Sequence, residues 1–171
     1  MSKNIETDIL IIGAGPVGLF TVFEAGLLGL NCHLVDNLDK IGGQCIELYP
    51  EKPIYDIPGV PNQTGKEHID SLLEQIEPFD YEVHLNQRVD KIEQKGDHWI
   101  AETSDGISFK TLNIFIAAGA GSFEPRKPPV ESPDKFVGKG VDYAVRSIDK
   151  YKDKDIVIFG GGDSALDWSV E

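Results

Sequence analysis

The amino-acid sequence predicts an α/β protein: a parallel βαβ unit, an antiparallel meander, and the start of a second strand–turn–helix unit. Near-continuous apolar runs such as residues 8–12 are typical of strands in a parallel sheet whose two faces are covered. Three glycine clusters follow such runs directly, and glycine there lets a ligand approach the backbone closely. Between residues 88 and 109, apolar and polar residues instead alternate, which indicates antiparallel strands.

The first βαβ unit occupies the N-terminal part of the chain. Residues 8–12 predict a buried strand. A helix over 16–30 follows, and Pro16 is tolerated in its first turn. A second short strand over 33–35 ends at Asp36. A strand, a helix and a parallel strand in this order form one compact supersecondary unit.

Beyond this unit, residues 37–61 are rich in proline and predict an irregular segment, too long for an idle connection. An amphipathic helix is predicted over 65–79. The remaining strands are predicted over 82–85, 88–92, 99–102, 107–109, 112–118 and 155–159. The proline-rich residues 122–133 predict a connector between two domains, 1–121 and 122–171. Because a helix begins at Asp163 and the sequence ends about two turns later, we expect a fragment of a longer protein.

The spacing Gly13-x-Gly15-x-x-Gly18 carries the clearest functional signal. It follows a predicted strand and opens a predicted helix, and Asp36 comes 18 residues after Gly18 at a strand end. This context predicts a dinucleotide site in a Rossmann-like fold, although a plain strand–turn–helix is the alternative. Gly13 makes the tight turn, Gly15 admits a pyrophosphate at the helix N-terminus, and Gly18 packs helix on strand. The motif by itself fits NAD or FAD.

Composition excludes several classes of function. The 171 residues include 16 Lys and Arg against 29 Asp and Glu, a formal net charge of −13, without a basic cluster. That balance argues against nucleic acid and anionic membranes as partners. No apolar run approaches the ~20 residues of a membrane span, and the polar start of the sequence is unlike a signal peptide. We therefore expect a cytoplasmic protein.

The sequence resembles the two-dinucleotide-domain flavoprotein reductases of the class-II pyridine nucleotide-disulfide oxidoreductase superfamily. Within them it is most similar to the N-terminal half of the thioredoxin-reductase-like ferredoxin–NADP reductases. The motifs that carry the resemblance are IIGAGPVG at 11–18, GGQ at 42–44, LYPEKPIYDIPG at 48–59 and GGGDSA at 160–165. The resemblance implies an FAD-binding Rossmann-like βαβ with an antiparallel β-meander, followed by the start of a second, NAD(P)-binding Rossmann-like domain.

The resemblance also implies cofactor-binding residues. Asp36 would hold the FAD ribose, Gln44 and Tyr49 would line the flavin, and the Val89 backbone would contact adenine. Tyr49, Val89 and Phe123 are also interpretable as ordinary core residues. The full implied set is Gly13, Gly15, Pro16, Gly18, Asp36, Gln44, Tyr49, Val89 and Phe123 for FAD, and Gly160, Gly162, Asp163 and Ser164 for NADPH.

Neither a dithiol nor a metal centre is predicted. Cys45 lies where disulfide reductases carry the first cysteine of a redox pair, but Pro50 stands at the second position. Residues 144–147, where thioredoxin reductases carry theirs, contain no thiol, and Cys32 is interpreted as a small buried hydrophobe. The histidines are scattered along the sequence and lack metal-ligand spacing, so they are interpreted as structural or solvated; they are His33, His68, His84 and His98. No catalytic side chain is expected, because the flavin carries the chemistry.

The resemblance implies an NADPH-dependent FAD flavoprotein that passes electrons to ferredoxin or flavodoxin, as a homodimer when complete. The first alternative is a thioredoxin-reductase-like flavoprotein with another disulfide or quinone acceptor. The second is a non-catalytic FAD-binding fragment. The 171-residue chain alone is expected to bind FAD weakly or aggregate and to show no NADPH oxidation.

Overall fold

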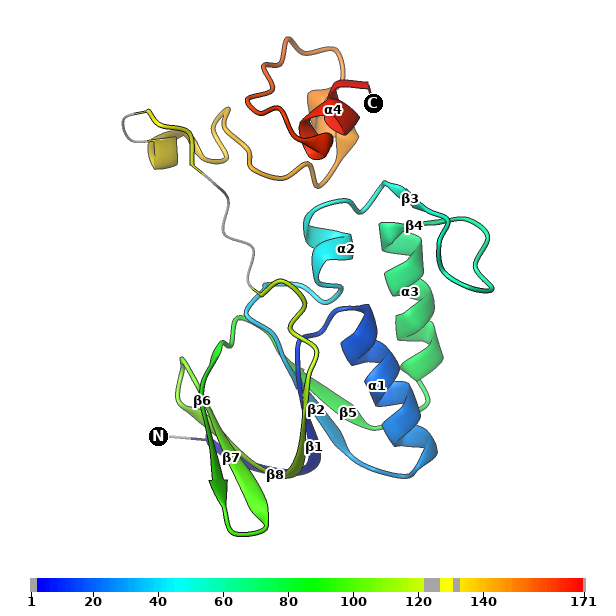
Figure 1. The fold of residues 1–171 in the computed structure, drawn as a ribbon, viewed down its shortest axis with the longest axis vertical. Coiled ribbons are helices and arrows are strands. Elements are labelled where there is room, and N and C mark those ends of the chain that lie inside the picture. The colour runs from blue at the N-terminus through cyan, green and yellow to red at the C-terminus, as the bar shows by residue number, and fades with distance from the viewer. Residues whose placement is uncertain (1–2, 122–126, 131–132, 171) are drawn as a thin grey trace.

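The computed structural model describes residues 3–121, 127–130 and 133–170, and its centre is a six-stranded sheet in the order β5-β2-β1-β8-β7-β6 (Figure 1). The strands of this sheet are β1 (Lys3–Ile12), β2 (Cys32–Val35), β5 (Tyr81–His84), β6 (Val89–Lys95), β7 (His98–Thr103) and β8 (Ile107–Ile116). The helices are α1 (Pro16–Leu27), α2 (Gln44–Glu47), α3 (Gly65–Ile76) and α4 (Asp163–Val170), with 3-10 turns at Pro133–Phe136 and Ile148–Tyr151. Strands β5, β2, β1 and β8 run parallel, and β8, β7 and β6 form an antiparallel meander. The predicted fold class is confirmed.

One face of the sheet is covered by α1 and α3, which lie side by side (Figure 1). Ile9, Ile11 and Leu34 are buried on this face. They pack in one cluster with Leu19 of α1 and Ile69 of α3. Because side chains alternate along a strand, the residues between them belong to the other face.

The opposite face has a second, smaller core. Leu10 of β1 and Val35 of β2 are buried there against Ala101 of β7 and Phe109 of β8. The meander therefore supplies the cover that helices give to the other side. Burial on both faces explains why residues 8–12 are continuously apolar.

Several predicted boundaries move because strand pairing extends or joins elements. β1 begins at Lys3 rather than at residue 8, since its first half pairs in register with β8. The separate strands predicted over 107–109 and 112–118 are a single strand, β8. The irregular segment contains α2 and the strand β3 (Pro53–Ile54), which pairs with β4 (Gln63–Thr64).

The prediction of a buried strand over 155–159 is wrong. These residues form no strand, and Val157 and Phe159 are 94% and 78% exposed. An isolated extended segment gains little without a hydrogen-bonded neighbour, and no strand in the described part of the chain pairs with it. The helix predicted to begin at Asp163 is present as α4.

The carboxyl-terminal residues contact α2 and the segment that follows it. Arg146 forms an ion pair with Glu47 at 2.6 Å, and Lys52 pairs with Asp167 of α4. The backbone N–H of Ile148 donates to the Glu51 carboxylate. Among the residues that the structure describes, no helix is long and apolar enough to cross a membrane.

Candidate dinucleotide-binding site

The turn between β1 and α1 has a backbone that only glycine adopts easily. Gly13 has a φ of +111°, and a Cβ there would lie 2.3 Å from the carbonyl oxygen of Ala117. Its N–H donates to the carbonyl of Val35 at 2.8 Å, which ties the turn to the end of β2. The helix α1 begins at Pro16, as predicted, and Gly15 is its N-cap. With no side chain capping them, the first amides of the helix are suited to an anion.

A second glycine turn faces the first. Gly42 donates its N–H to the carbonyl of Ala14 at 2.9 Å. A Cβ on Gly43 would lie 3.1 Å from the Cα of Gly15, so the two turns meet backbone to backbone. The short helix α2 starts at Gln44, immediately after this contact. The motif at residues 42–44 therefore builds one wall of the site beside the first turn.

Asp36 is fixed at the edge of the same turn. Its Oδ2 accepts a hydrogen bond from the N–H of Ala14 at 2.7 Å, and its Oδ1 accepts one from the N–H of Leu38 at 2.9 Å. The backbone N–H of Asp36 donates to the carbonyl of His84 on β5. Each carboxylate oxygen can accept more than one hydrogen bond, so both keep capacity for ligand hydroxyl groups.

These parts surround a pocket of about 410 Å³ at the carboxyl ends of β1, β2 and β8. Strand β2 lies on one side of β1 and β8 lies on the other, so the strand order reverses at β1. Open α/β sheets bind ligands at such a point. The predicted residues that line the pocket are Gly13, Gly15, Pro16, Asp36, Gln44, Tyr49 and Val89. The volume lies within the range of small-molecule sites.

The other predicted residues lie elsewhere. Gly18 sits beneath the pocket, where a Cβ would lie 2.0 Å from the Gly13 carbonyl oxygen, so α1 packs closely on the turn. Phe123 lies outside the described residues. The four residues predicted for NADPH lie at the exposed start of α4 and do not line this pocket; they are Gly160, Gly162, Asp163 and Ser164.

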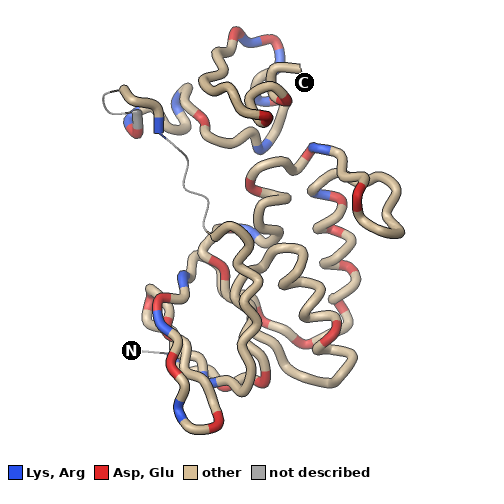
Figure 2. The backbone as a smooth tube through the Cα atoms, in the orientation of Figure 1, with Lys and Arg blue, Asp and Glu red and all other residues tan. Residues whose placement is uncertain are grey.

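The lining residues that sequence reasoning missed include Gln87 and Arg88, which join β5 to β6. The N–H of Gln87 donates to the carbonyl of Asp36 at 2.9 Å, so this connection is held against the end of β2. Their position in the sequence could have identified them, since they come soon after β5, a parallel strand of the same sheet. Arg88 is paired with Asp90, and Figure 2 shows Lys and Arg dispersed along the chain.

Both cysteines are free, buried thiols. Burial raises the pKa of Cys32 to about 11, and the carboxylate of Asp8 adds to this. Burial also raises the pKa of Cys45, although a hydrogen bond with Tyr49 opposes the shift. Since the thiolate is the reactive form, neither environment activates a cysteine near neutral pH.

The interpretation of the histidines as scattered is wrong for two of them. His33 on β2 and His84 on β5 are in contact, with Nδ1 of the first 2.9 Å from Nε2 of the second. Their rings stack 5.2 Å apart and lie against Phe109, on the face away from α1 and α3. Burial lowers the pKa of each imidazole below its ordinary 6.5; Lys3 lowers both further, and Glu82 opposes the shift.

This pair makes stability depend on pH. Because the folded protein holds these imidazoles at lowered pKa values, the unfolded chain binds more protons below about pH 6.5. The free energy of unfolding should therefore fall as the pH drops below that value. Urea unfolding between pH 7.5 and 5.5, with a metal chelator present, measures this dependence. His84→Leu should flatten the dependence, and an unchanged slope in that variant would contradict the assignment.

A parallel sheet with the glycine turn at its switch point is the architecture of a Rossmann-like dinucleotide-binding domain. The chain belongs to the pyridine nucleotide-disulphide oxidoreductase family, whose family model matches residues 50–171. The predicted recognition is thereby confirmed.

Three relatives illustrate the similarity. The ferredoxin–NADP reductase of Bradyrhizobium sp. (strain BTAi1) is 56% identical over 171 residues, which are 99% of this chain and 50% of that protein. That of Pelagibacter ubique is 54% identical over 98% of this chain and 49% of its own length. The thioredoxin reductase structure from Lactococcus lactis superposes with a TM-score of 0.63 at 26% identity, over 81% of this chain and 43% of that one. The chain thus spans about half the length of the curated relatives it matches.

Proposed function

We propose that this chain provides the FAD-binding part of a reductase that moves electrons between NADPH and ferredoxin or flavodoxin. The observation that carries the proposal is the pocket in which the glycine turn, Asp36, Gln44 and Tyr49 meet. The relatives named ferredoxin–NADP reductase, more than half identical over nearly the whole chain, support the reaction.

The residues of the pocket fit FAD. No side chain caps the amides at the start of α1 beside Gly15, where a pyrophosphate would sit. Asp36 would accept hydrogen bonds from the adenosine ribose, and the Val89 backbone would contact adenine. Gln44 and Tyr49 would bound the flavin and exclude water from it. When bound, FAD supplies two-electron chemistry with NADPH and one-electron chemistry with a carrier protein.

The proposal divides the chain into residues 1–121 for FAD and 122–171 for the beginning of the NADPH domain. Gly160, Gly162, Asp163 and Ser164 would meet the NADPH pyrophosphate at the start of α4, and Phe123 would lie beside FAD. A homodimer in the cytoplasm belongs to the same proposal. The family resemblance supports these assignments.

Flavin binding tests the central claim. The 171-residue chain, purified without a tag, is titrated with FAD while flavin fluorescence is followed, and FMN serves as the control ligand. We expect weak but saturable binding of one FAD per chain and markedly weaker binding of FMN, which lacks the adenosine that Asp36 would hold. Equal affinity for the two flavins would contradict the assignment of the glycine turn and Asp36.

The acceptor is tested in the protein that carries this chain. Reduction of cytochrome c by NADPH should depend on added ferredoxin or flavodoxin. A thioredoxin-reductase-like protein is the second candidate, because solved thioredoxin reductases share the fold. That protein would instead reduce a disulfide or a quinone without the carrier.

Both cysteines should be dispensable for electron transfer. In the doubly substituted protein, Cys32→Ser and Cys45→Ser, NADPH-dependent ferredoxin reduction should persist, because burial keeps both thiols protonated. Some stability should be lost, since a hydroxyl replaces a buried sulfur at each site. Loss of activity with flavin still bound would point to a thiol mechanism.

A further inference from the structure

On the sheet face opposite α1 and α3, two histidines and a glutamate from neighbouring strands converge. We infer that His33, Glu82 and His84 form a binding site for one transition-metal ion, with Zn²⁺ as the ion whose chemistry fits best. The site is separate from the pocket lined by the glycine turn and uses none of its residues.

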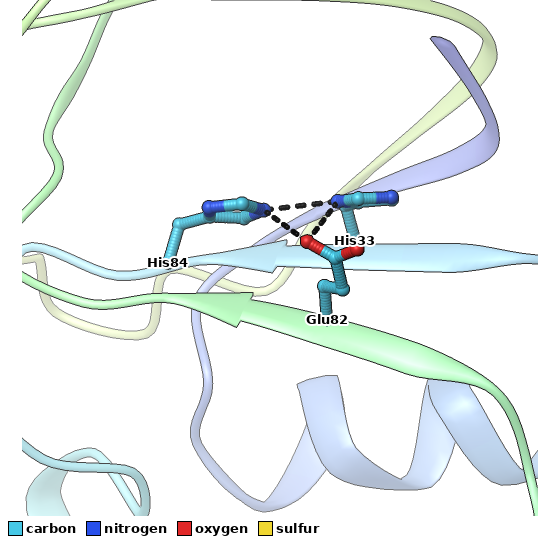
Figure 3. Close-up of side chains that lie close together, drawn as sticks. All are labelled: His33, Glu82 and His84. Atoms are coloured by element: carbon cyan, nitrogen blue, oxygen red, sulfur yellow. Dashed lines mark hydrogen bonds and ion pairs between the residues drawn. The ribbon is translucent and has the colours of Figure 1, made fainter. Parts of the chain in front are cut away.

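Strand register places the three side chains together. Glu82 lies directly opposite His33 in the parallel pairing of β2 and β5. His84 follows Glu82 by two residues, so both project from the same face of β5. Figure 3 shows the two imidazoles pointing their nitrogens toward each other, with the Glu82 carboxylate beside them.

The distances fit a metal ion. Nδ1 of His33 and Nε2 of His84 are 2.9 Å apart, and the nearer Glu82 oxygen is 4.0 Å from the first and 3.9 Å from the second. A point about 2.1 Å from all three atoms, the length of Zn–N and Zn–O bonds, lies in the plane of those atoms. Tetrahedral coordination needs the two nitrogens to separate from 2.9 Å to about 3.4 Å, a small shift of the two rings. Two imidazoles and a carboxylate are a donor set that suits Zn²⁺, Cu²⁺, Ni²⁺ or Co²⁺ rather than Mg²⁺ or Ca²⁺.

The burial and charge around the three side chains suit a bound ion. The imidazoles are only 13% and 10% exposed and pack against Phe109, whereas Glu82 is 64% exposed and leaves a solvent side for a water ligand. Metal binding requires both imidazoles in the neutral form. Nδ1 of His33 coordinates once its ring proton resides on Nε2. Lys3 is the nearby cation that opposes the ion, and Glu82 supplies the compensating negative charge.

A bound metal ion would stabilise the edge of the sheet. The ion would join β2 to the edge strand β5 at His84, whose carbonyl also accepts the backbone hydrogen bond from the N–H of Asp36. An ion that binds only the folded state raises its stability by mass action. Zn²⁺ should therefore raise the melting temperature of the chain.

The test uses the 171-residue chain without a tag, stripped with a chelator and dialysed. Co²⁺ is titrated in while its visible absorption is followed, and Zn²⁺ is then added in competition. We expect one Co²⁺ per chain, displaced by Zn²⁺, and a melting temperature that rises with Zn²⁺. Glu82→Gln and His84→Leu should weaken binding by about tenfold or more, since even changes outside the ligand shell cost 10- to 100-fold.

Glu82→Gln keeps the result interpretable, because this exposed side chain is not needed for the core. The matched control is His98→Ala at the end of the β6–β7 hairpin, whose histidine lies outside the cluster and should leave Co²⁺ binding unchanged. The proposal is overturned if the wild-type chain binds no stoichiometric Co²⁺, or if Glu82→Gln and His84→Leu bind it as tightly as the wild type. FAD binding is not measured here, so failure would leave the proposed function untouched.

Discussion

Replacing Gly18 by alanine should lower the free energy of unfolding by about 3 kcal/mol or more, the upper end of overpacking effects. The added Cβ would lie 2.0 Å from the carbonyl oxygen of Gly13 and 3.4 Å from Cγ2 of Ile11. That oxygen belongs to the backbone of the tight turn, so it cannot swing aside as a side chain would. Thermal unfolding should show a melting temperature roughly 6–12 °C lower for a chain of this size.

Gly15→Ala is the matched control in the same motif. Its Cβ would meet only the Cα of Gly43 at 3.8 Å, an ordinary van der Waals distance. Stability should therefore change by no more than about 0.5 kcal/mol, while FAD binding weakens because the methyl group occupies the approach to the backbone amides. Equal unfolding energies for Gly18→Ala and the wild type would contradict the close packing of α1 on the turn.

The first unit could be predicted from sequence because its signals are local. An apolar run, a glycine spacing and a proline within a few residues define β1, the turn and α1. The position of Asp36 follows from the same unit, since the acid ends β2. The structure adds that its carboxylate is bonded to the amide of Ala14, inside the motif itself.

Elements that depend on distant partners could not be bounded in this way. Residues 3–7 are polar except for Ile5 and become strand through pairing with residues 107–111. The run at 155–159 has strand composition but pairs with none of the described residues. By contrast, the start of α3 carried a readable signal, because Thr64 and Glu67 form a capping box of the expected spacing.

The same distinction between local and distant signals applies to the residues of the site. Residues adjacent to the glycine turns were predictable, whereas Gln87 and Arg88 reach the pocket only through the pairing of β5 with β2. His33 and His84 are 51 residues apart, and their contact follows from parallel register rather than from spacing. A one-residue shift of β5 would turn its side chains to the opposite face, so sequence spacing alone cannot reveal such a cluster.

Replacing Asp36 by alanine should weaken FAD binding by about 1.5–3 kcal/mol, the value of a hydrogen bond to a charged group. This corresponds to a roughly 10- to 150-fold higher Kd. The side chain is held by the amides of Ala14 and Leu38 at the mouth of the pocket, so its oxygens are already placed for the ribose hydroxyls. Fluorescence titration of the chain with FAD measures the change.

Two variants separate ligand binding from a loosened turn. Asp39→Ala removes an exposed carboxylate from the same loop, outside the pocket lining, and should leave the Kd unchanged. Asp36→Asn keeps one acceptor oxygen but loses the charge, so its Kd should fall between those of the wild type and Asp36→Ala. FMN has no adenosine, so the weak FMN binding of the chain should respond little to any of these changes. If Asp36→Ala binds FAD as tightly as the wild type, Asp36 serves only to hold the amide of Ala14, and another group must take the ribose.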